Sequence, residues 1–207
     1  MQFEPGHLYH IYNQGNNRQP IFLKRENYLY FIRKIRVHVL PYADILAWCL
    51  MPNHFHLMVY VNCVGLVVSP RATQSCTRTN VTFNKSIGIM LASYTRAINK
   101  QENWTGSLFR NGTKAIILSE SKGISFSCKT NTGAAQFSSE YPNVCFNYIL
   151  SNPLRAKLVK RVEDWEFSSY LDIMAIRNLK LINRERIEEF GLQINSPGAT
   201  EVAPGLY

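Results

Sequence analysis

The chain has 207 residues, of which 46% are hydrophobic, and its formal net charge is +9. This length predicts a single domain whose core is large enough to fold without covalent staples. The apolar runs are all shorter than the roughly 20 residues that a membrane-spanning helix needs, and the basic excess favours a polyanionic partner.

The cysteines and the N-terminal residues predict where the protein works. The five cysteines, at positions 49, 63, 76, 128 and 145, are odd in number and include no close pair. This spacing argues against a disulfide framework or a zinc ribbon and fits a reducing cytosol. The first residues lack a basic segment followed by an apolar one, so no secretory signal is expected. We therefore expect a cytoplasmic protein.

The first sixty residues predict a strand, then a helix, then two strands that form a hairpin. Residues 7–14 alternate and are rich in Tyr and Ile, which predicts a strand that ends at the Gly-Asn-Asn-Arg turn from Gly15. Residues 25–40 repeat apolar side chains at helical spacing before Pro41. Residues 45–51 are fully apolar and predict a central strand, with residues 54–61 as its hairpin partner.

The rest of the chain alternates polar segments with elements of regular structure. The polar segments 62–86 and 119–139 are expected to be loops. Helical spacing marks residues 87–100, and a strand is expected within 107–118. A further helix is expected from Tyr141 to about residue 151, since Pro153 disfavours its continuation. A last amphipathic helix is expected over 181–192, before a flexible tail at 195–207.

The order of these elements predicts the fold class. Strand, helix, strand, strand, helix and strand follow one another, which is the order of an α+β, ferredoxin-like fold. In such a fold an antiparallel sheet has its helices packed on one face. The helix from Tyr141 is an addition after the sixth element and is free to cover the open face. We expect one domain over residues 1–170, and a C-terminal helix and tail over 171–207.

Two histidines at the start of the second hairpin strand are the first candidate site. In the run Pro-Asn-His-Phe-His that begins at Pro52, His54 and His56 are two residues apart. Strand side chains alternate, so both imidazoles leave one face while Phe55 points to the other. Two neighbouring imidazoles can bind one divalent metal. A half-buried strand with two histidines on its polar face is the alternative.

Tyr148 and Asn152 are the second candidate pair. They are four residues apart, so on a helix they share one face. An amide oxygen beside two imidazoles, with other positions open, suits Mg²⁺ or Mn²⁺. A tyrosine next to such an ion is a candidate nucleophile, because the metal polarises a phosphate. The alternatives are a core aromatic at Tyr148 and a helix cap at Asn152. Tyr94 is a rival nucleophile, although its place on an apolar helical stripe favours a core position.

Three sequence blocks resemble a known family. The Met-Pro-Asn-His-Phe-His-Leu run from Met51 resembles the HUH signature of the single-tyrosine transposases, most of all their REP-associated branch. The Tyr-Ile-Leu-Ser-Asn-Pro-Leu-Arg-Ala run from Tyr148 resembles the tyrosine-helix motif of that family. The Trp-Glu-Phe-Ser-Ser-Tyr run from Trp165 resembles the segment that follows it. The resemblance covers about residues 6–170.

The resemblance implies a chemistry and a set of partners. It implies a metal-dependent enzyme that cleaves and rejoins single-stranded, hairpin-associated DNA through a 5′-phosphotyrosine bond at Tyr148, with Mg²⁺ or Mn²⁺ held by His54, His56 and Asn152. It also implies a bacterial, nucleoid-associated protein that works as a monomer or a homodimer. The basic and amide side chains expected at the DNA are Asn16, Asn17, Arg18, Arg96, Arg110, Lys114 and Arg155.

Other classes of function remain to be weighed against this one. A non-catalytic nucleic-acid-binding module of ferredoxin-like fold would stack bases on sheet aromatics, but here the open face would carry His54 and His56. A decayed transposase copy would keep the motifs without the activity. A replication initiator or relaxase would use the same chemistry, often in a larger chain. A structural zinc protein needs two more ligands than the histidine pair supplies.

Overall fold

The core of the protein is a four-stranded antiparallel sheet. The computed structural model describes residues 2–62, 65–68, 79–118 and 141–195. The strands of the sheet are β1 (Leu8–Gln14), β2 (Ala43–Met51), β3 (His54–Val61) and β6 (Lys114–Ile117), in the order β2-β3-β1-β6. This is the strand order that a βαββαβ chain gives in a ferredoxin-like fold, so the predicted fold class is confirmed.

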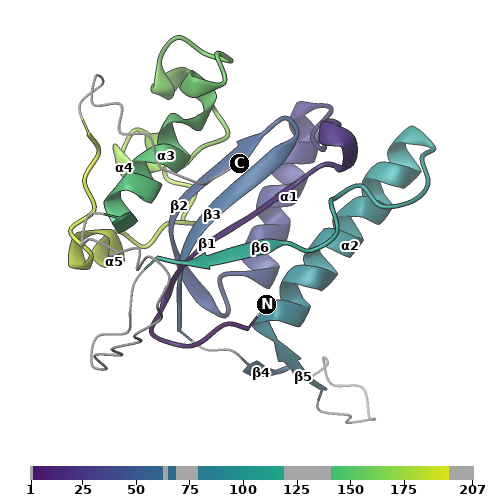
Figure 1. Ribbon diagram of the computed structural model, residues 1–207, viewed down its shortest axis with the longest axis horizontal. Coiled ribbons are helices and arrows are strands. Elements are labelled where there is room, and N and C mark those ends of the chain that lie inside the picture. The colour runs from purple at the N-terminus through teal and green to yellow at the C-terminus, as the bar shows by residue number, and fades with distance from the viewer. Residues whose placement is uncertain (1, 63–64, 69–78, 119–140, 196–207) are drawn as a thin grey trace, which may run out of the picture.

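Two helices cover one face of the sheet. Figure 1 shows α1 (Arg25–His38) and α2 (Phe83–Glu102) next to each other on one side of the strands. Their apolar stripes pack on side chains that alternate out of the strands, such as Ile11 and Phe55. The apolar faces of the two helices and of the sheet thus form a single apolar layer.

The expected loop at 62–86 is partly wrong. Strand β4 (Gly65–Val68) pairs with β5 (Thr79–Thr82) in a separate two-stranded sheet. Helix α2 then begins at residue 83 rather than 87, because the Thr82 hydroxyl accepts a hydrogen bond from the Lys85 backbone N–H at 3.2 Å. A threonine at this position caps a helix and fixes its first turn. The polar composition of the segment indicated neither the two strands nor the earlier start of the helix.

The last strand is shorter than expected. Only Lys114–Ile117 of the expected strand 107–118 pairs with β1. Residues 104–113 form an irregular segment that contacts the chain just after β1 at the Gly15–Phe109 bridge. The expected loop at 119–139 and nearly all of the expected tail lie outside the described residues. The loop after β1 contains a short 3-10 turn, η1 (Asn16–Arg18).

A third long helix lies on the opposite face of the sheet. Helix α3 (Tyr141–Arg155) packs against β2 and β3 on the side away from α1 and α2 (Figure 1). The helix was expected to end at about residue 151, before Pro153, and this prediction is wrong. The helix continues past the proline, because the Ala156 backbone N–H still donates to the Asn152 carbonyl oxygen at 2.9 Å. The proline removes only its own donor and lies in the last turn of the helix.

Strand β2 is an edge strand of the sheet rather than the central strand that its apolar sequence predicted. Two later segments cover its outer edge. Cys49 forms a bridge with Ser168, and Ile45 forms one with Ile182. The Leu50 backbone N–H also donates to the Phe167 carbonyl oxygen at 2.8 Å. The strand is therefore buried on both sides, which is why its sequence resembles that of a central strand.

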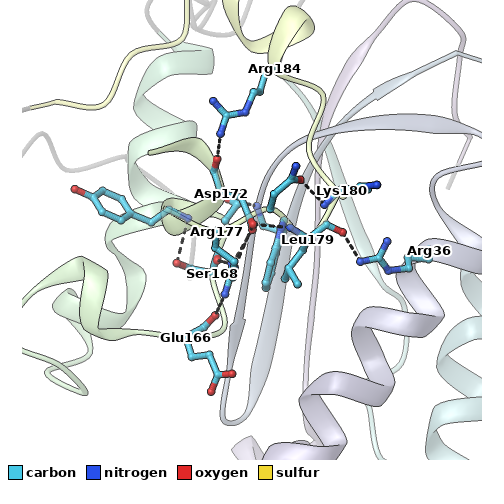
Figure 2. A network of polar contacts seen from close by, with 12 residues as sticks. Arg36, Glu166, Ser168, Asp172, Arg177, Leu179, Lys180 and Arg184 are labelled. Atoms are coloured by element: carbon cyan, nitrogen blue, oxygen red, sulfur yellow. Dashed lines mark hydrogen bonds and ion pairs between the residues drawn. The ribbon is translucent and has the colours of Figure 1, made fainter. Parts of the chain in front are cut away.

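The C-terminal segment is tied together by one carboxylate. The segment holds η2 (Val162–Asp164), α4 (Tyr170–Ile173) and α5 (Arg184–Glu189). Figure 2 shows Asp172 between the Arg177 guanidinium, 2.7 Å away, and the Leu179 backbone N–H, 2.9 Å away. Arg177 also donates to the carbonyl oxygens of Glu166 and Ser168, each at 2.5 Å. These contacts hold the chain that covers β2 in one arrangement.

Helix α5 is shorter than the helix expected over 181–192. It begins after Asn183, whose side chain accepts a hydrogen bond from the Arg186 backbone N–H at 3.1 Å. It ends before Gly191, which has a φ of 61°, a value that favours glycine. Cys49 and Cys145 are buried in the apolar core, as expected.

Candidate active site

The histidine pair lies where the alternation of the strand predicted. His54 and His56 leave the same face of β3, and their ring centroids are 5.0 Å apart at an interplanar angle of 85°. Phe55 points to the other face, where its ring packs 5.2 Å from that of Phe31 in helix α1. The predicted placement of the two imidazoles on one side of a strand is therefore confirmed.

The turn before β3 sets the orientation of His54. The Asn53 side-chain oxygen lies 2.6 Å from His54 Nδ1, which donates its proton to that oxygen. Since a neutral imidazole carries one proton, His54 Nε2 then holds a lone pair. That lone pair faces the Asn152 side-chain oxygen on α3 at 3.4 Å. Two facing lone pairs are a favourable arrangement when a cation lies between them.

The sheet also brings a third histidine to this face, one that the sequence analysis did not single out. His10 on β1 is fully buried, and its Nε2 lies 2.8 Å from His56 Nδ1. Its ring stacks on that of Tyr12, with centroids 4.8 Å apart. The only sequence signal for His10 is its place in an alternating strand. Which strand lies next to β1, and in which register, decides its partner.

Burial keeps these three imidazoles neutral near neutral pH. It lowers the pKa of His10 from 6.5 to about 3. It also lowers the pKa of His54, although the contact with Asn152 opposes this shift. The pKa of His56 falls well below its usual range, first because of burial and then because of its two histidine neighbours. Neutral imidazoles are the form that binds a metal.

Several buried polar atoms of this cluster have no hydrogen-bond partner within the described part of the chain. They are His10 Nδ1, His56 Nε2 and the Asn152 amide nitrogen. Buried polar atoms without partners are rare in folded proteins and each calls for an explanation. A free His56 Nε2 beside the facing pair of His54 and Asn152 fits the donor set of a divalent metal.

The donor set decides which metals this cluster suits. Ligands of Mg²⁺ lie about 2.1 Å from the ion, which puts neighbouring ligands roughly 3 Å apart, close to the 3.4 Å between His54 Nε2 and the Asn152 oxygen. Across the described residues, no three His, Cys, Asp or Glu side chains form a metal-binding group. The candidate site therefore has only two strong nitrogen donors, supplemented by an amide oxygen.

Helix α3 places Tyr148 beside this cluster. The Tyr148 ring lies edge-on to His56, with centroids 5.5 Å apart, and 6.4 Å from His10. The Arg155 guanidinium, two turns along the helix, lies 5.4 Å from the centre of the Tyr148 ring. The predicted common face of Tyr148 and Asn152 is thus directed at the histidines.

The rival tyrosine lies in the core on the other side of the sheet. Tyr94 on α2 is fully buried, and its hydroxyl donates to the Ile21 carbonyl oxygen at 2.7 Å. Burial raises the pKa of this phenol well above its usual value. Tyr94 therefore has a structural role, as its place on the apolar stripe indicated.

The turn after β1 lies at the same end of the sheet as His54. The Gly15 backbone N–H donates to the Asn53 carbonyl oxygen at 2.8 Å, and a Cβ at Gly15 would lie 2.2 Å from the Gln19 carbonyl oxygen. Asn17 and Arg18 are exposed and have positive φ angles of 51° and 59°. This backbone is held in a conformation that few residues adopt, which fixes where both side chains leave the main chain.

The other residues expected at the DNA do not all lie on one side of the sheet. Asn16 is committed to the fold, since its amide donates to the Ser107 carbonyl oxygen at 2.7 Å. Arg110 is exposed next to the turn, and its backbone N–H donates to the Gln14 carbonyl oxygen at 2.8 Å. Lys114 pairs with Tyr12, which pairs with His56, so Lys114 shares their face of the sheet. Arg96 lies exposed on α2, on the opposite side.

Comparison with solved structures finds a protein of similar fold. A solved structure, described as a REP-associated tyrosine transposase bound to a REP hairpin, superposes with a TM-score of 0.51 and 15% sequence identity. The match covers 99% of this chain and 97% of that one. The two proteins share a fold. No family model matches the sequence, and no curated protein matches it. No helix within the described ranges is long and apolar enough to cross a membrane.

Proposed function

We propose that the protein is a metal-dependent transposase or endonuclease that cleaves and rejoins single-stranded DNA next to a hairpin, with Tyr148 as its nucleophile. The observation that carries this proposal is the docking of α3 on the histidine face of the sheet. It brings the Asn152 oxygen to 3.4 Å from His54 Nε2 and the Tyr148 ring to 5.5 Å from that of His56. The hairpin-bound protein of the same fold supports DNA of this kind as the substrate.

The proposed reaction exchanges one phosphoester for another. The Tyr148 oxygen forms a bond to the phosphorus as the bond from phosphorus to the 3′ oxygen breaks, and the phenolic proton ends on the departing 3′ oxygen. The DNA fragment with the 5′ phosphate stays on the tyrosine. Attack by a 3′-hydroxyl reverses the step and rejoins the strands. Because the bonds exchanged are of similar kind, no ATP is needed.

Each residue of the proposed site has a separate task. His54, His56 and Asn152 would hold Mg²⁺ or Mn²⁺, which when bound polarises the scissile phosphate and offsets the weak nucleophilicity of a phenol. Packing against His56 fixes the direction of the Tyr148 ring. The Arg155 guanidinium lies over that ring and puts a positive charge next to the phenol.

The competing binding-module function has less support in the fold. Binders of that class stack bases on the open face of their sheet. Here α3 covers that face over β2 and β3, and side chains of α3 such as Phe146 and Ile149 are buried in an apolar cluster with Cys49 and Met58 of the strands. The remaining route for DNA is along the end of the sheet near Arg18 and Arg110 and along the exposed strand β6 with Lys114.

The test is formation of a covalent adduct. A set of single-stranded hairpin oligonucleotides with single-stranded flanks is labelled at the 3′ end, because the fragment retained on the tyrosine carries the 5′ phosphate. The protein is incubated with the set in Mn²⁺ or Mg²⁺, and adducts are separated on a denaturing gel. We expect an adduct with the unchanged protein and none with Tyr148→Phe, since that change removes only the attacking oxygen.

The matched control is Tyr141→Phe. Tyr141 is seven residues earlier on the same helix, and the variant loses the same hydroxyl, so we expect it to form the adduct. An adduct with Tyr148→Phe but not with Tyr94→Phe would move the nucleophile to Tyr94. Failure of the unchanged protein with every hairpin in both metals would favour the binding module or a decayed copy.

A further inference from the structure

His10 is a buried polar side chain that none of the proposed tasks uses. It is fully buried, and its ring lies between those of Tyr12 at 4.8 Å and His56 at 5.0 Å, with the Tyr148 ring of α3 at 6.4 Å. The only hydrogen bond of its side chain in the described structure joins Nε2 to His56 Nδ1, at 2.8 Å, while its Nδ1 has no partner. A buried ring nitrogen without a partner destabilises the folded state, so the presence of His10 at this position calls for an explanation.

The direction of this hydrogen bond follows from the proposed site. If His56 binds a metal through Nε2, that atom must offer a lone pair, and the single proton of the neutral ring is on Nδ1. His56 Nδ1 then donates to His10 Nε2, which has to accept. The proton of His10 is therefore on its own Nδ1, the atom that has no partner. In this arrangement the N–H at His10 Nδ1 has no partner, and His56 Nε2 carries the lone pair that a metal needs.

We infer that His10 is a positioning residue that fixes the ring orientation and the tautomer of His56 for metal binding, an inference that rests on the proposed function. His10 is not a ligand itself, because its Nε2 is engaged by His56 rather than directed at Asn152. Groups that accept a hydrogen bond from a metal-binding histidine commonly tune its affinity for the metal. Here the acceptor is a second histidine on the neighbouring strand β1.

The experiment compares two substitutions at this position. His10→Phe keeps an aromatic ring for stacking on Tyr12 but removes the acceptor, whereas His10→Gln supplies an amide oxygen that can accept from His56 Nδ1. Mn²⁺ binding to the DNA-free protein is measured by calorimetry and by the electron spin resonance of free Mn²⁺. We expect His10→Phe to bind Mn²⁺ roughly 10- to 100-fold more weakly and His10→Gln to recover part of that loss.

A second measurement reads the tautomers directly. Long-range ¹H–¹⁵N spectra of the Mg²⁺-saturated protein distinguish protonated from unprotonated ring nitrogens. We expect His56 and His10 both to carry their protons on Nδ1. In His10→Phe, the His56 spectrum should change while circular dichroism and the thermal unfolding curve show a folded protein. A merely structural role for His10 would not set the tautomer of its neighbour.

The outcomes separate this inference from the proposed function. If the unchanged protein binds no Mn²⁺, or His56→Ala binds it as tightly, the metal centre itself is wrong. If His56→Ala abolishes binding but His10→Phe binds as tightly as the unchanged protein, the inference alone is overturned. A proton on His10 Nε2 in the Mg²⁺-saturated protein, or an equal loss in His10→Gln and His10→Phe, overturns it as well.

Discussion

Two buried polar clusters in the described part of the chain differ in how their atoms are paired. Around Asp172, the carboxylate accepts from Arg177 and from the Leu179 backbone N–H, and its own backbone oxygen accepts from Arg184. Around His54 and His56, by contrast, polar atoms of three side chains lack partners within the described residues. Both clusters lie against β2 or β3, so burial alone does not distinguish them.

The difference separates a polar cluster that stabilises the fold from one that is available for chemistry. Burying polar groups is tolerated when each finds a partner, and unpaired ones destabilise the folded state. The Asp172 cluster meets this condition and holds the C-terminal segment on β2. The histidine cluster does not meet it. Of its three atoms that lack partners, His56 Nε2 is one that the proposed metal would bind. Perturbed, unpaired groups of this kind gather at functional sites.

The largest effect is expected from breaking the satisfied cluster. Asp172→Asn replaces the carboxylate with an amide whose N–H₂ faces the Arg177 guanidinium, so a buried charge loses its partner. Removing one partner of a buried ion pair costs about 3 kcal/mol or more. We expect the free energy of unfolding, measured by urea denaturation, to fall by about that amount. An unchanged unfolding midpoint would show that the network is dispensable.

The matched change in the unsatisfied cluster is Asn152→Ala. The Asn152 amide nitrogen has no hydrogen bond to lose, so the free energy of unfolding in a chelator should change by no more than about 1 kcal/mol. Binding of Mn²⁺ should nevertheless weaken. A destabilisation as large as that of Asp172→Asn would contradict the distinction between the two clusters.

The next effect is a dependence of the free energy of unfolding on pH that is caused by the histidine cluster. Its folded pKa values lie below the unfolded value of 6.5, and that of His10 is about 3. The unfolded state therefore binds more protons as the pH falls below about 6.5, and stability decreases, by up to about 1.4 kcal/mol per pH unit for each histidine.

Urea denaturation of the metal-free protein between about pH 7 and about pH 5 measures this slope. We expect His10→Phe to make it shallower, because one of the buried groups that must charge has been removed. A free energy of unfolding that does not change over this range would mean that the histidines are solvated in the folded protein.

The smallest effect concerns which face of the sheet meets the DNA. Lys114 lies on the histidine face and Arg96 on the opposite side, although both were expected at the DNA. A lysine that contacts a phosphate contributes about 0.7 to the slope of log affinity against log salt for single strands. We expect Lys114→Gln to reduce that slope by about this amount in hairpin-binding titrations, and Arg96→Gln to leave it unchanged. The reverse result would place the DNA along α2.

Local patterns predicted what depends on local spacing. The alternation around His54 and His56 gave their common face, and helical spacing gave the common face of Tyr148 and Asn152. The contact between these two pairs on one face of the sheet was expected from the resemblance and from the open face of the predicted fold. The strand order follows from the βαββαβ sequence of elements, because few arrangements of such a chain are compact.

The features that the sequence did not predict depend on distant segments. His10 contacts His56 diagonally, since the register pairs His10 with Met58 and Tyr12 with His56. Such a diagonal contact is visible only once the register is known. The burial of β2 at the edge of the sheet depends on residues 167–183, and its apolar sequence fits an edge or a centre equally well.

The covering of β2 also bears on how the chain folds as it is synthesised. The Trp48 backbone N–H bonds to the Ser169 hydroxyl, a partner 121 residues later in the chain. The apolar strand therefore leaves the ribosome long before the segment that protects its outer edge. An unprotected apolar edge can pair with another nascent chain. The interval before residues 167–183 emerge is thus the period in which this protein is most exposed to aggregation, and truncation before Ser168 should yield insoluble protein.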